Sequence, residues 1–496
     1  MTAFGDGVRG LLADMARAYA GHPRAGAVRA AAARLDGPLH VAFAGRVKAG
    51  KSTLLNAIVG ERLAATDAGE CTLVLTWYVN GVAARAWAHP RTGPPRQVPF
   101  DRVDGRTVLG LGPFRAQDLE RMVVEVPASR LARLTLIDTP GIGSVHADVS
   151  ARTDAAMAHT EDAGPVADAV LYLMRHLHTS DVGFLEAFRD EQFGEPTPVN
   201  AIGVLSRADE VGPGRTDALD LARRVAAGYR REPRIRALVQ TVVPVAGLIG
   251  EAAAILRERD FAALAAVATS GAAGDALLLS ADRFGAEHPG FPVPAAERRA
   301  LIGLMALSGV RLSVALVRAG VVTDAAGLAR ELRARSGLDE LQEVLLTQFT
   351  ERRDLIKAQN ALQTAERILT RDPVPGTDRL RMRLEAILAG AHELTELRVL
   401  NDLRTGVIAL ADEDVRDDAE ALLGLHGGDV RARLRLPPDT PAAEIRPALL
   451  DALRRWQRHA VHPAATVSHR RLADVLRRTC EGQLAATRPT PRPRPR

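Results

Sequence analysis

The sequence predicts an α/β domain, with a mostly parallel sheet and helices on both faces, followed by a long α-helical bundle. Two observations favour the α/β domain. An apolar run at 39–44 leads through a glycine-bounded loop into an amphipathic segment, and further apolar runs end in polar or small residues. The bundle is predicted because apolar residues recur at helical spacing beyond residue 250, where Ala, Leu and Arg dominate.

Composition bounds the classes of protein that fit. The 496 residues are enough for two or three domains, and a net charge of +5 is mild for this length. Nucleic acid is therefore not an expected partner, although a locally basic face would suit an anionic membrane. The distant Cys71 and Cys480 form no metal or disulfide pattern, which suits a reducing cytoplasm. The charged N-terminus is unlike a signal peptide, and Arg311 and Arg318 argue against a membrane span at 301–322.

The chain begins with a predicted helical region at 6–35, broken by Gly21-His22-Pro23. A helix before the first strand is not needed for a nucleotide-binding domain. We therefore expect this region to pack elsewhere.

Residues 45–52 fit the pattern GxxxxGK[ST] between a strand and a helix, which is the context that makes it a phosphate-binding loop. Its glycines let backbone amides point at a phosphate, and the helix N-terminus adds positive charge. Lys51 is predicted to reach the outer phosphates, and the Ser52 hydroxyl is predicted to hold Mg²⁺. The predicted nucleotide-binding residues of this loop are Arg46, Val47, Lys48, Ala49, Gly50, Lys51, Ser52 and Thr53.

Lysine is almost absent from this chain. Lys48, Lys51 and Lys357 are the three lysines among 65 basic Lys and Arg residues, and two of them lie in this loop. Lysine is a compact point charge that fits a tight phosphate cradle, whereas arginine is a wide planar fork. The retained lysines therefore indicate function.

The next segment contains a candidate metal ligand. Predicted strands at 73–78 and 82–88 flank Asn80-Gly81, which favours a type I′ hairpin. Thr72 lies where the preceding loop enters the first strand, and a threonine there can close over Mg²⁺ and a γ-phosphate. Thr66 is the competing candidate.

A further strand at 134–138 ends in Asp138-Thr139-Pro140-Gly141. Asp138, at the carboxyl end of this strand, can hold the Mg²⁺ shell. The Gly141 amide can sense the γ-phosphate.

Base recognition is predicted at the ends of two later strands. The strand at 199–205, which follows another at 169–174, ends in Ser206-Arg207-Ala208-Asp209. The Asp209 carboxylate can accept two hydrogen bonds from guanine, and adenine presents no matching pair of donors. Ser206 and Arg207 supply a hydroxyl and a stacking cation. After the strand at 241–245, amides at Ala246 and Gly247 can contact the base carbonyl.

These five motifs, in this order and spacing, resemble those of a Ras-like GTPase. They resemble those of the dynamin superfamily more closely. The loop at 45–60, the Thr72-Trp77-Tyr78 segment, the run 138–141 and the run 206–209 resemble bacterial dynamin-like proteins. The run 45–51, the Ser-Arg-Ala-Asp variant at 206–209 and the overall length are most similar to the isoniazid-inducible dynamin-like proteins of mycobacteria. The resemblance implies hydrolysis of GTP to GDP and phosphate with Mg²⁺. Lys48, Lys51 and Thr72 are then the catalytic candidates, and the metal ligands are Ser52, Thr72 and Asp138.

Two departures from the dynamin pattern matter. Dynamins usually place a serine at the position of Lys48, where it helps to hold a monovalent cation. The Lys48 ammonium could supply that charge directly, as an arginine finger does in cis. Val47 stands where many eukaryotic members have a water-orienting glutamine, so we expect slow intrinsic hydrolysis.

The helical half is predicted to be a stalk. Apolar stripes at 338–369 and 380–397, on either side of a turn at 373–376, predict two antiparallel helices of about 30 residues and about 45 Å. The resemblance implies a trunk, with a neck formed by helices from both chain ends. A plain helical domain without a lever function is the alternative.

These expectations divide the chain into four parts. Residues 1–35 are assigned to a neck helix, 36–285 to the GTPase domain and 286–486 to the helical neck and trunk. The Pro/Arg tail, residues 487–496, is expected to be disordered. At 430–436, arginines alternate with apolar residues, which as an extended segment would suit lipid headgroups. A solvated loop or edge strand is the alternative.

The leading hypothesis is a cytoplasmic GTPase that couples nucleotide-dependent association to membrane binding or remodelling. It would lie in the cytoplasm or peripherally on the inner face of the plasma membrane, with GTP or GDP and either a second copy or a second dynamin-like protein as partners. The alternative is a regulatory GTPase that acts on a protein or RNA without membrane activity. Asp209 argues against a third class, a P-loop ATPase.

Overall fold

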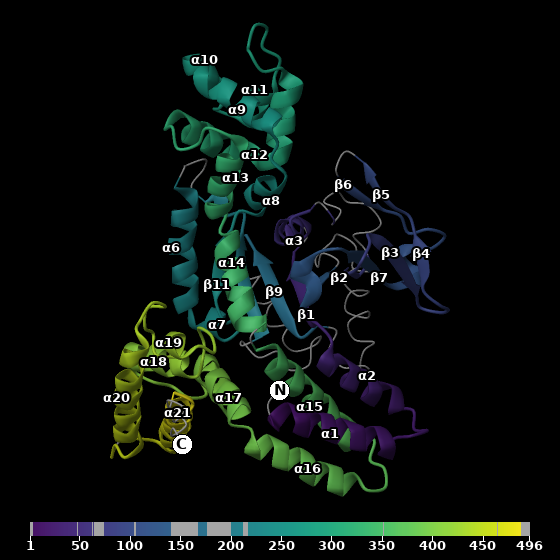
Figure 1. Ribbon diagram of the computed structural model, residues 1–496, viewed down its shortest axis with the longest axis vertical. Coiled ribbons are helices and arrows are strands. Elements are labelled where there is room, and N and C mark those ends of the chain that lie inside the picture. Colours follow the sequence, from purple (N-terminus) through teal and green to yellow (C-terminus); the bar gives the residue numbers. More distant parts are fainter. Residues whose placement is uncertain are drawn as a thin grey trace, which may run out of the picture.

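The computed structural model describes residues 3–46, 48–61, 63, 74–103, 106–139, 167–175, 200–211, 217–350, 352–463 and 465–487. A twisted sheet lies at the centre, a helical lobe lies at one end of the molecule and two groups of helices lie at the other (Figure 1). The predicted combination of an α/β domain with a helical region is confirmed.

Within the described residues, nine strands form one mixed sheet, and the neighbouring strands β11, β10, β9, β1 and β8 are all parallel. Strands β5 (Phe100–Val103) and β6 (Arg106–Leu109) form a separate antiparallel pair. The strands of the large sheet, in spatial order, are β11 (Val242–Val245), β10 (Ala201–Ser206), β9 (Ala169–Met174), β1 (Leu39–Gly45), β8 (Leu134–Asp138), β2 (Thr76–Asn80), β7 (Leu119–Val126), β3 (Arg85–Pro90) and β4 (Arg96–Val98).

The hairpin predicted around Asn80-Gly81 is wrong. Strands β2 and β3 do not pair, because β7 lies between them, parallel to β2 and antiparallel to β3. The Gly81 N–H donates to Val126 O of β7, so the turn is closed by a strand that comes later in the chain. A local turn signal cannot reveal such an inserted strand.

Both faces of the sheet are buried over its parallel strands β11, β10, β9, β1 and β8. Alternate residues of β1 point to opposite faces, so Val41 and Phe43 join one hydrophobic cluster and Ala42 and Ala44 join the other. Helices α3 and α14 pack on the first face, and α6, α8, α9, α12 and α13 belong to the second cluster. The helices of this part are α3 (Lys51–Val59), α6 (Ala218–Arg231), α7 (Pro233–Arg236), α8 (Gly247–Ile255), α9 (Glu258–Thr269), α10 (Gly271–Leu277), α11 (Ala281–Gly285), α12 (Ala295–Arg318), α13 (Ala325–Ala334) and α14 (Leu338–Val344).

The domain boundary predicted at residue 285 falls inside one core. Leu301 of α12 and Leu328 of α13 share a cluster with the sheet, and Leu338 of α14 joins the cluster on the other face. The α/β domain therefore continues through α14 by its packing. Helical spacing alone could not separate helices that cover a sheet from helices that form a bundle.

Helix α12 is long and apolar enough by composition to cross a membrane, the one such helix among the described residues. It packs instead in the helical lobe, where Arg311 donates to Leu278 O and Arg318 donates to Ala268 O. Its backbone is kinked at Met305 and Ala306, whose φ and ψ angles are non-helical. Of its most apolar window, 44% is buried inside the molecule.

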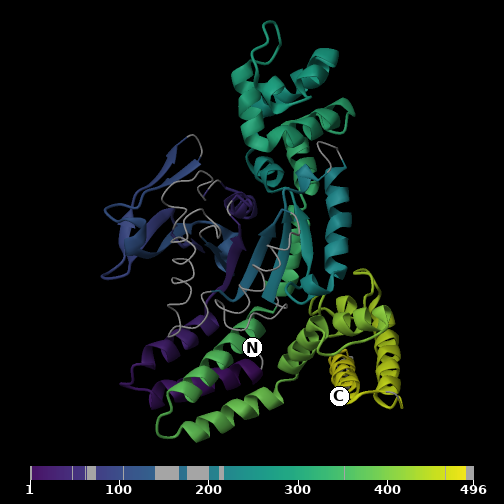
Figure 2. The same ribbon diagram turned by 180° about the vertical axis from the view of Figure 1, so that it is seen from behind.

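Below the sheet, the two N-terminal helices α1 (Ala3–Ala18) and α2 (Ala25–Asp36) pack against α15 (Arg353–Arg371) and α16 (Thr377–Gly390) in one cluster. The four helices lie side by side in both ribbon views (Figures 1 and 2). The break predicted at residues 21–23 separates α1 from α2. We refer to α1, α2, α15 and α16 as the neck helices.

The C-terminal helices form a separate cluster, whereas the resemblance implied a neck with contributions from both chain ends. This cluster docks on the α/β domain through a buried ion-pair group: Arg404 and Arg236 both bond to Glu420, and Arg404 also donates to Val239 O at 2.7 Å. Its helices are α17 (His392–Thr405), α18 (Glu413–Leu422), α19 (Val430–Arg433), α20 (Ala442–Ala460) and α21 (Val467–Ala486).

In the described part of 338–397, the two continuous stalk helices that the stripes predict are not present. A π-helical turn at Leu345–Thr350 interrupts the first apolar stripe, and non-helical Ala391 interrupts the second. Leu338 and Ile356 pack under the sheet, whereas Leu362 belongs to the neck cluster, so one stripe serves two cores. An apolar stripe shows which face is buried but not against what.

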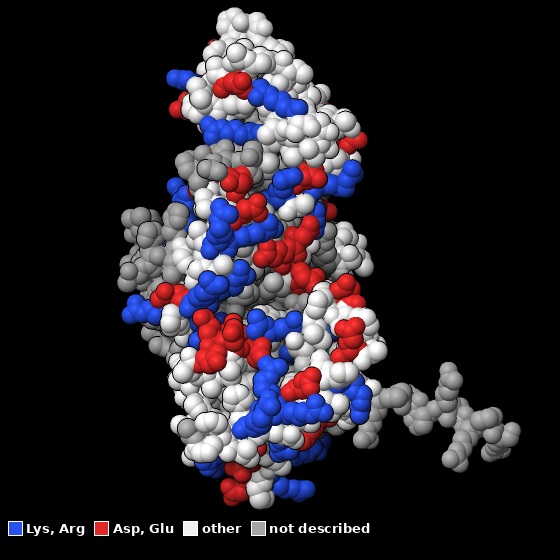
Figure 3. Space-filling model, turned by 90° about the vertical axis from the view of Figure 1, so that its left-hand side faces the viewer, with Lys and Arg blue, Asp and Glu red and all other residues white. Residues whose placement is uncertain are grey.

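The segment at 430–436 is also not an extended lipid-facing strand. Residues 430–433 form α19, Arg433 bonds to Glu396 at 3.1 Å and Arg435 bonds to Asp418 at 3.0 Å. Arg433 and Arg435 are therefore paired with acidic side chains of the protein itself. On the face that carries α6, basic and acidic side chains are likewise interleaved (Figure 3).

The third lysine lies at the junction between the sheet and the neck helices. Asp168, just before β9, accepts hydrogen bonds from Arg34 of α2 at 2.9 Å and Asn360 of α15 at 3.0 Å. Lys357 of α15 lies 3.6 Å from the same carboxylate and donates to Arg34 O. Burial alone would raise the pKa of Asp168, but Arg34 and Lys357 hold it below its ordinary value. We call these four residues the neck junction.

Replacing Asp168 by Asn should destabilise the fold by about 3 kcal/mol, because the buried Lys357 and the partly exposed Arg34 would lose their charged partner. Chemical denaturation at neutral pH measures this loss. The lowered pKa means that the stabilisation is present at neutral pH and disappears as pH falls through the folded-state value, so the two proteins should converge in acid. Asp36→Asn is the matched control, since Asp36 pairs with Arg9 at the surface. Equal losses would contradict a special role for the junction.

Candidate functional site

The loop between β1 and α3 has the backbone that a phosphate cradle requires. Gly45 has φ +145°, and a Cβ there would lie 2.6 Å from Leu173 O of β9, so only glycine fits. Gly50 caps α3 in the left-handed region at φ +93°. Lys48 also has positive φ, +64°, which is unusual for a residue with a side chain. The loop therefore curls tightly around the N-terminus of α3.

The Lys51 ammonium lies inside this curl. It donates to Gly45 O at 3.1 Å and to Arg46 O at 3.4 Å, and the residue is 8% exposed. Burial lowers the pKa of Lys51, while the Asp138 carboxylate counteracts part of this effect. A buried cation whose ligands are neutral carbonyls is well placed to bind an anion.

Two oxygen donors for a cation stand next to Lys51. The Ser52 hydroxyl donates to Asp138 Oδ2 at 3.0 Å, and the pairing of β1 with β8 sets Asp138 beside Phe43. Burial raises the pKa of Asp138, while Lys51 and Ser52 pull it down. Thr139 holds the strand end through a 2.6 Å bond to Phe43 O.

These donors fit Mg²⁺ that is shared with a nucleotide. Among the described residues, no group of three or more His, Cys, Asp and Glu side chains could hold a metal by itself. Mg²⁺ is usually bound through one or two protein oxygens and substrate phosphates, and it prefers hard oxygen ligands. Ser52 and Asp138 supply such oxygens.

A cavity of about 190 Å³ opens beside the loop. The phosphate loop, the ends of β10 and β11 and the kink of α12 border it, so segments far apart in sequence meet here. Its lining residues include Gly50, Thr53, Ser206, Arg207, Asp209, Gly247 and Ala306.

The predicted base-recognition residues take different positions around this cavity. Arg207, in the left-handed region, donates to Lys48 O at 3.2 Å and to Glu210 at 2.8 Å, which ties the two loops together. The Ser206 hydroxyl donates to Met174 O at 3.1 Å. Gly247 begins α8 and borders the cavity. The Ala246 N–H is committed to Ser336 O, so it differs from the prediction and is not offered to a base.

Asp209 lies on a single helical turn, residues 208–210, at the cavity wall. Its Oδ2 accepts a 2.6 Å hydrogen bond from the Ser308 hydroxyl of α12. Burial raises the pKa of the Asp209 carboxyl, and Ser308 opposes that effect.

The structure therefore brings together Lys48, Lys51, Ser52, Asp138, Arg207 and Asp209 on one edge of the sheet, where parallel strands end. Val47, Thr66, Thr72 and Gly141 lie outside the described residues, so their roles stay predictions. Sequence reasoning missed Ala306 and Ser308, because no motif marks residues of a later helix as neighbours of residue 209.

Comparison with known proteins agrees with this geometry. A family model described as the 50S ribosome-binding GTPase matches residues 40–196. The chain is 38% identical over 458 residues to the isoniazid-induced protein IniC of Mycobacterium tuberculosis, which covers 91% of each chain. It is also 29% identical over 151 residues to the bacterial dynamin-like protein of Nostoc punctiforme, which covers 28% of this chain and 21% of that protein.

One solved structure, of an oligomerised bacterial dynamin pair, is 12% identical with a TM-score of 0.34, and the alignment covers 98% of this chain and 75% of that chain. At that TM-score the likeness adds nothing to the assignment. The identity to IniC extends over nearly the whole of both chains, and it accompanies a phosphate loop with its Ser52–Asp138 pair. This chain belongs to the family of IniC among the bacterial dynamin-like proteins, and it is a P-loop enzyme that hydrolyses GTP.

Proposed function

We propose that this GTPase selects guanine through Asp209, uses Mg²⁺ at Ser52 and Asp138, and couples nucleotide-dependent association to membrane binding. The observation that carries the proposal is that the phosphate loop and the Asp209 turn border one cavity and are joined through Arg207 and Lys48 O. A nucleotide in that cavity would have its base at Asp209 and its phosphates at Lys51. Mg²⁺, when bound, would neutralise charge on the phosphate oxygens.

Each side chain would then have a defined task. Lys51 would exchange its loop carbonyls for the outer phosphates, which also keep its ammonium protonated. Ser52 and Asp138 would orient the metal. Lys48, exposed at the loop, would supply positive charge near the bond that breaks.

Lys48→Ala should slow GTP hydrolysis by about tenfold or more while GTP binding changes little, because the lost charge matters most in the transition state. Single-turnover hydrolysis and equilibrium binding separate the two effects. Potassium should restore part of the lost rate, and Lys48→Arg should retain more activity than Lys48→Ala. A hydrolysis rate equal to that of the unsubstituted chain would show that Lys48 is structural.

A route from the site to the neck helices supports the coupling. Strand β9 packs beside β1 in parallel, with Gly45 opposite Leu173, and the residue just before β9 is Asp168 of the neck junction. Movement of β1 and β9 at the nucleotide would therefore reach α2 and α15 through a buried ion-pair network.

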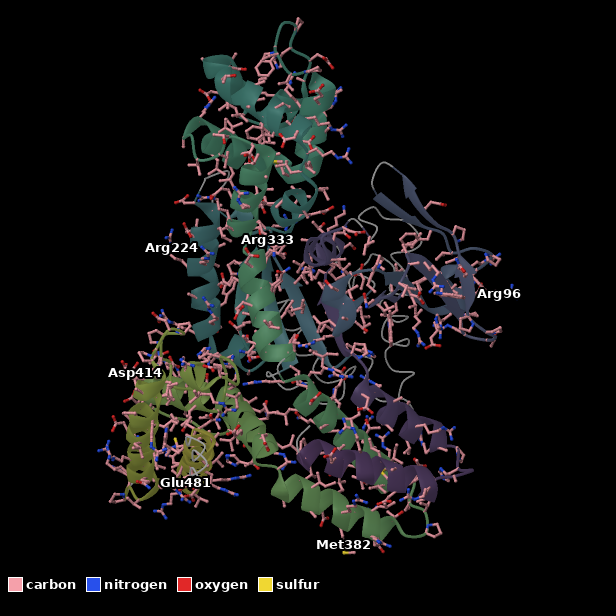
Figure 4. All side chains as sticks on the ribbon, in the orientation of Figure 1. Arg96, Arg224, Arg333, Met382, Asp414 and Glu481 are labelled. Atoms are coloured by element: carbon pink, nitrogen blue, oxygen red, sulfur yellow. The ribbon has the colours of Figure 1, made fainter. Side chains whose placement is uncertain are left out.

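The membrane part rests on the dynamin-like family. The neck also ends in an apolar side chain: Met382, 63% exposed, projects from the outer side of α16 (Figure 4). Flotation with vesicles that contain anionic lipid, with and without GTP and with a candidate second dynamin-like chain, tests association. Absence of binding under every condition would remove the membrane claim.

A second candidate is a regulatory GTPase that acts on a protein or RNA partner. The match of residues 40–196 to a family described as ribosome-binding favours it. Co-sedimentation with ribosomes in GTP and GDP tests this candidate. Nucleotide-dependent sedimentation without vesicle flotation would place it first.

Competition between GTP and ATP for the site tests the base assignment common to both candidates. We expect GTP to compete far better, since guanine offers two donors to the Asp209 carboxylate. Equal competition by GTP and ATP would contradict the assignment of Asp209 to guanine recognition.

A further inference from the structure

Helix α12 reaches the base cavity from a part of the chain that no nucleotide-binding motif includes. Ala306 borders the cavity, and Ser308 donates to Asp209 Oδ2 at 2.6 Å across 99 positions of sequence. Ala306 is one of the two non-helical residues at the kink, and Ser308 follows two residues later. Their position is therefore set by an irregularity in an otherwise regular helix.

The backbone at the kink of α12 is strained, and surrounding side chains hold it in place. Ala306 has φ +54° and ψ 175°, a conformation that costs about 1–3 kcal/mol for a residue with a side chain. Met305 is fully buried and lies against Gly309, where a Cβ would come within 2.7 Å of the Met305 side chain. The Ser313 hydroxyl also contacts Met305 Sδ at 3.4 Å and donates to Gly309 O at 2.7 Å. Packing therefore holds the strained backbone that presents Ser308.

Asp209 and Ser308 also border a second, smaller cavity of about 80 Å³, which is lined by residues of α6, α8, α12 and α13. Asp209 thus borders two cavities, and the bond to Ser308 restrains the rotation of its carboxylate. An ionised carboxylate has about four acceptor positions, so one bond to Ser308 leaves enough for the two donors of guanine.

We propose that Ser308 is a positioning residue for guanine recognition, which orients the Asp209 carboxylate toward the base cavity and keeps it ready to accept two hydrogen bonds. This inference rests on the proposed role of Asp209 in selecting guanine. It adds a residue of α12 to the determinants of specificity.

The same contact predicts a pH effect. Burial raises the pKa of Asp209 and Ser308 opposes the rise, so loss of the hydroxyl should raise the pKa further. Guanine binding requires the ionised form and is lost as pH falls through this pKa. The other charged groups around Asp209 are Arg207 and Glu210 of its own turn, Asp220 and Arg223 of α6, and Arg335 after α13. None of these changes in a Ser308 variant.

The experiment compares Ser308→Ala, Ser308→Thr and the unsubstituted chain in equilibrium binding of GTP, ITP and ATP across pH 5–8. We expect Ser308→Ala to bind GTP about tenfold more weakly at neutral pH, and the pH of half-maximal binding to rise. Ser308→Thr retains a hydroxyl and should restore both. The advantage of GTP over ITP, which lacks the 2-amino group, should shrink in Ser308→Ala.

Ser270→Ala is the matched control, because it removes a hydroxyl that bonds Ala266 O of α9 instead of Asp209 or a residue of the kink. It should leave the pH profile and the GTP to ITP ratio unchanged. Suppose that the unsubstituted chain prefers GTP and that Ser308→Ala keeps the same GTP affinity, GTP to ITP ratio and pH profile. The role of Ser308 is then overturned, while guanine recognition by Asp209 stands. If the unsubstituted chain binds GTP and ATP equally, guanine recognition by Asp209 is overturned, and the inference falls with it.

Discussion

Lys51→Ala is expected to abolish measurable turnover and to weaken GTP binding by about 100-fold or more, which corresponds to about 2.7 kcal/mol. The ammonium is buried within the curl of the phosphate loop, where its present partners are the neutral carbonyls of Gly45 and Arg46. Without it, the outer phosphates would face a loop with one less buried positive charge. Titration with a fluorescent GTP analogue, together with phosphate release, measures both losses.

Thermal unfolding in the absence of nucleotide provides the control for Lys51→Ala. Removal of a buried charge that burial already disfavours should not reduce the stability of the free protein greatly. Added GTP should stabilise the unsubstituted chain and leave the variant unchanged, because ligand binding to the folded state raises its melting temperature. Near-normal turnover by a folded Lys51→Ala protein would be incompatible with the proposed phosphate site.

Asp209→Asn is expected to exchange the base preference of the enzyme. In the proposed arrangement the carboxylate would accept from guanine N1–H and the 2-amino group, whereas an amide would set a donor against that amino group. Xanthine has a carbonyl at this position and can accept from the amide. We expect GTP affinity to fall by about 100-fold and XTP to become the better substrate, since a mismatched buried polar pair costs several kcal/mol.

Hydrolysis of GTP, XTP and ATP by both proteins reads this exchange directly. Asn is isosteric with Asp and can still accept from Ser308, so the fold should be retained. Glu210→Gln is a control on the same turn, since Glu210 binds Arg207 and Arg175 rather than facing a base in the proposed arrangement. Unchanged nucleotide preference in Asp209→Asn would locate base recognition elsewhere.

The sequence was sufficient to predict the centre of the site because parallel strands carry their carboxyl ends to one edge of a sheet. Asp138 and Asp209 are far from the phosphate loop in sequence, yet each could be placed from the strand that precedes it. Lys51 and Ser52 lie where the loop and helix pattern predicts. The same logic fails for Ser308, which reaches Asp209 from the side of a kinked helix.

The larger departures have a similar cause. Asn80-Gly81 indicates a turn, but the partner of β2 on that side is β7, a strand contributed later in the chain. The stripe at 338–369 indicates a buried face, but the π-helical turn at 345–350 divides it between the sheet and the neck. Local sequence reports local conformation and burial, whereas these outcomes depend on which distant segments compete for the same surface.

The scarcity of lysine gives this protein a built-in chemical handle. Lys51 and Lys357 are 8% and 2% exposed, whereas Lys48 is exposed at the rim of the loop. A reagent that acylates primary amines would therefore react with one accessible side chain, that of Lys48, in addition to the N-terminal amine. A dye attached at Lys48 would report from the phosphate loop without an introduced cysteine, and a nucleotide that shields the loop would slow its attachment.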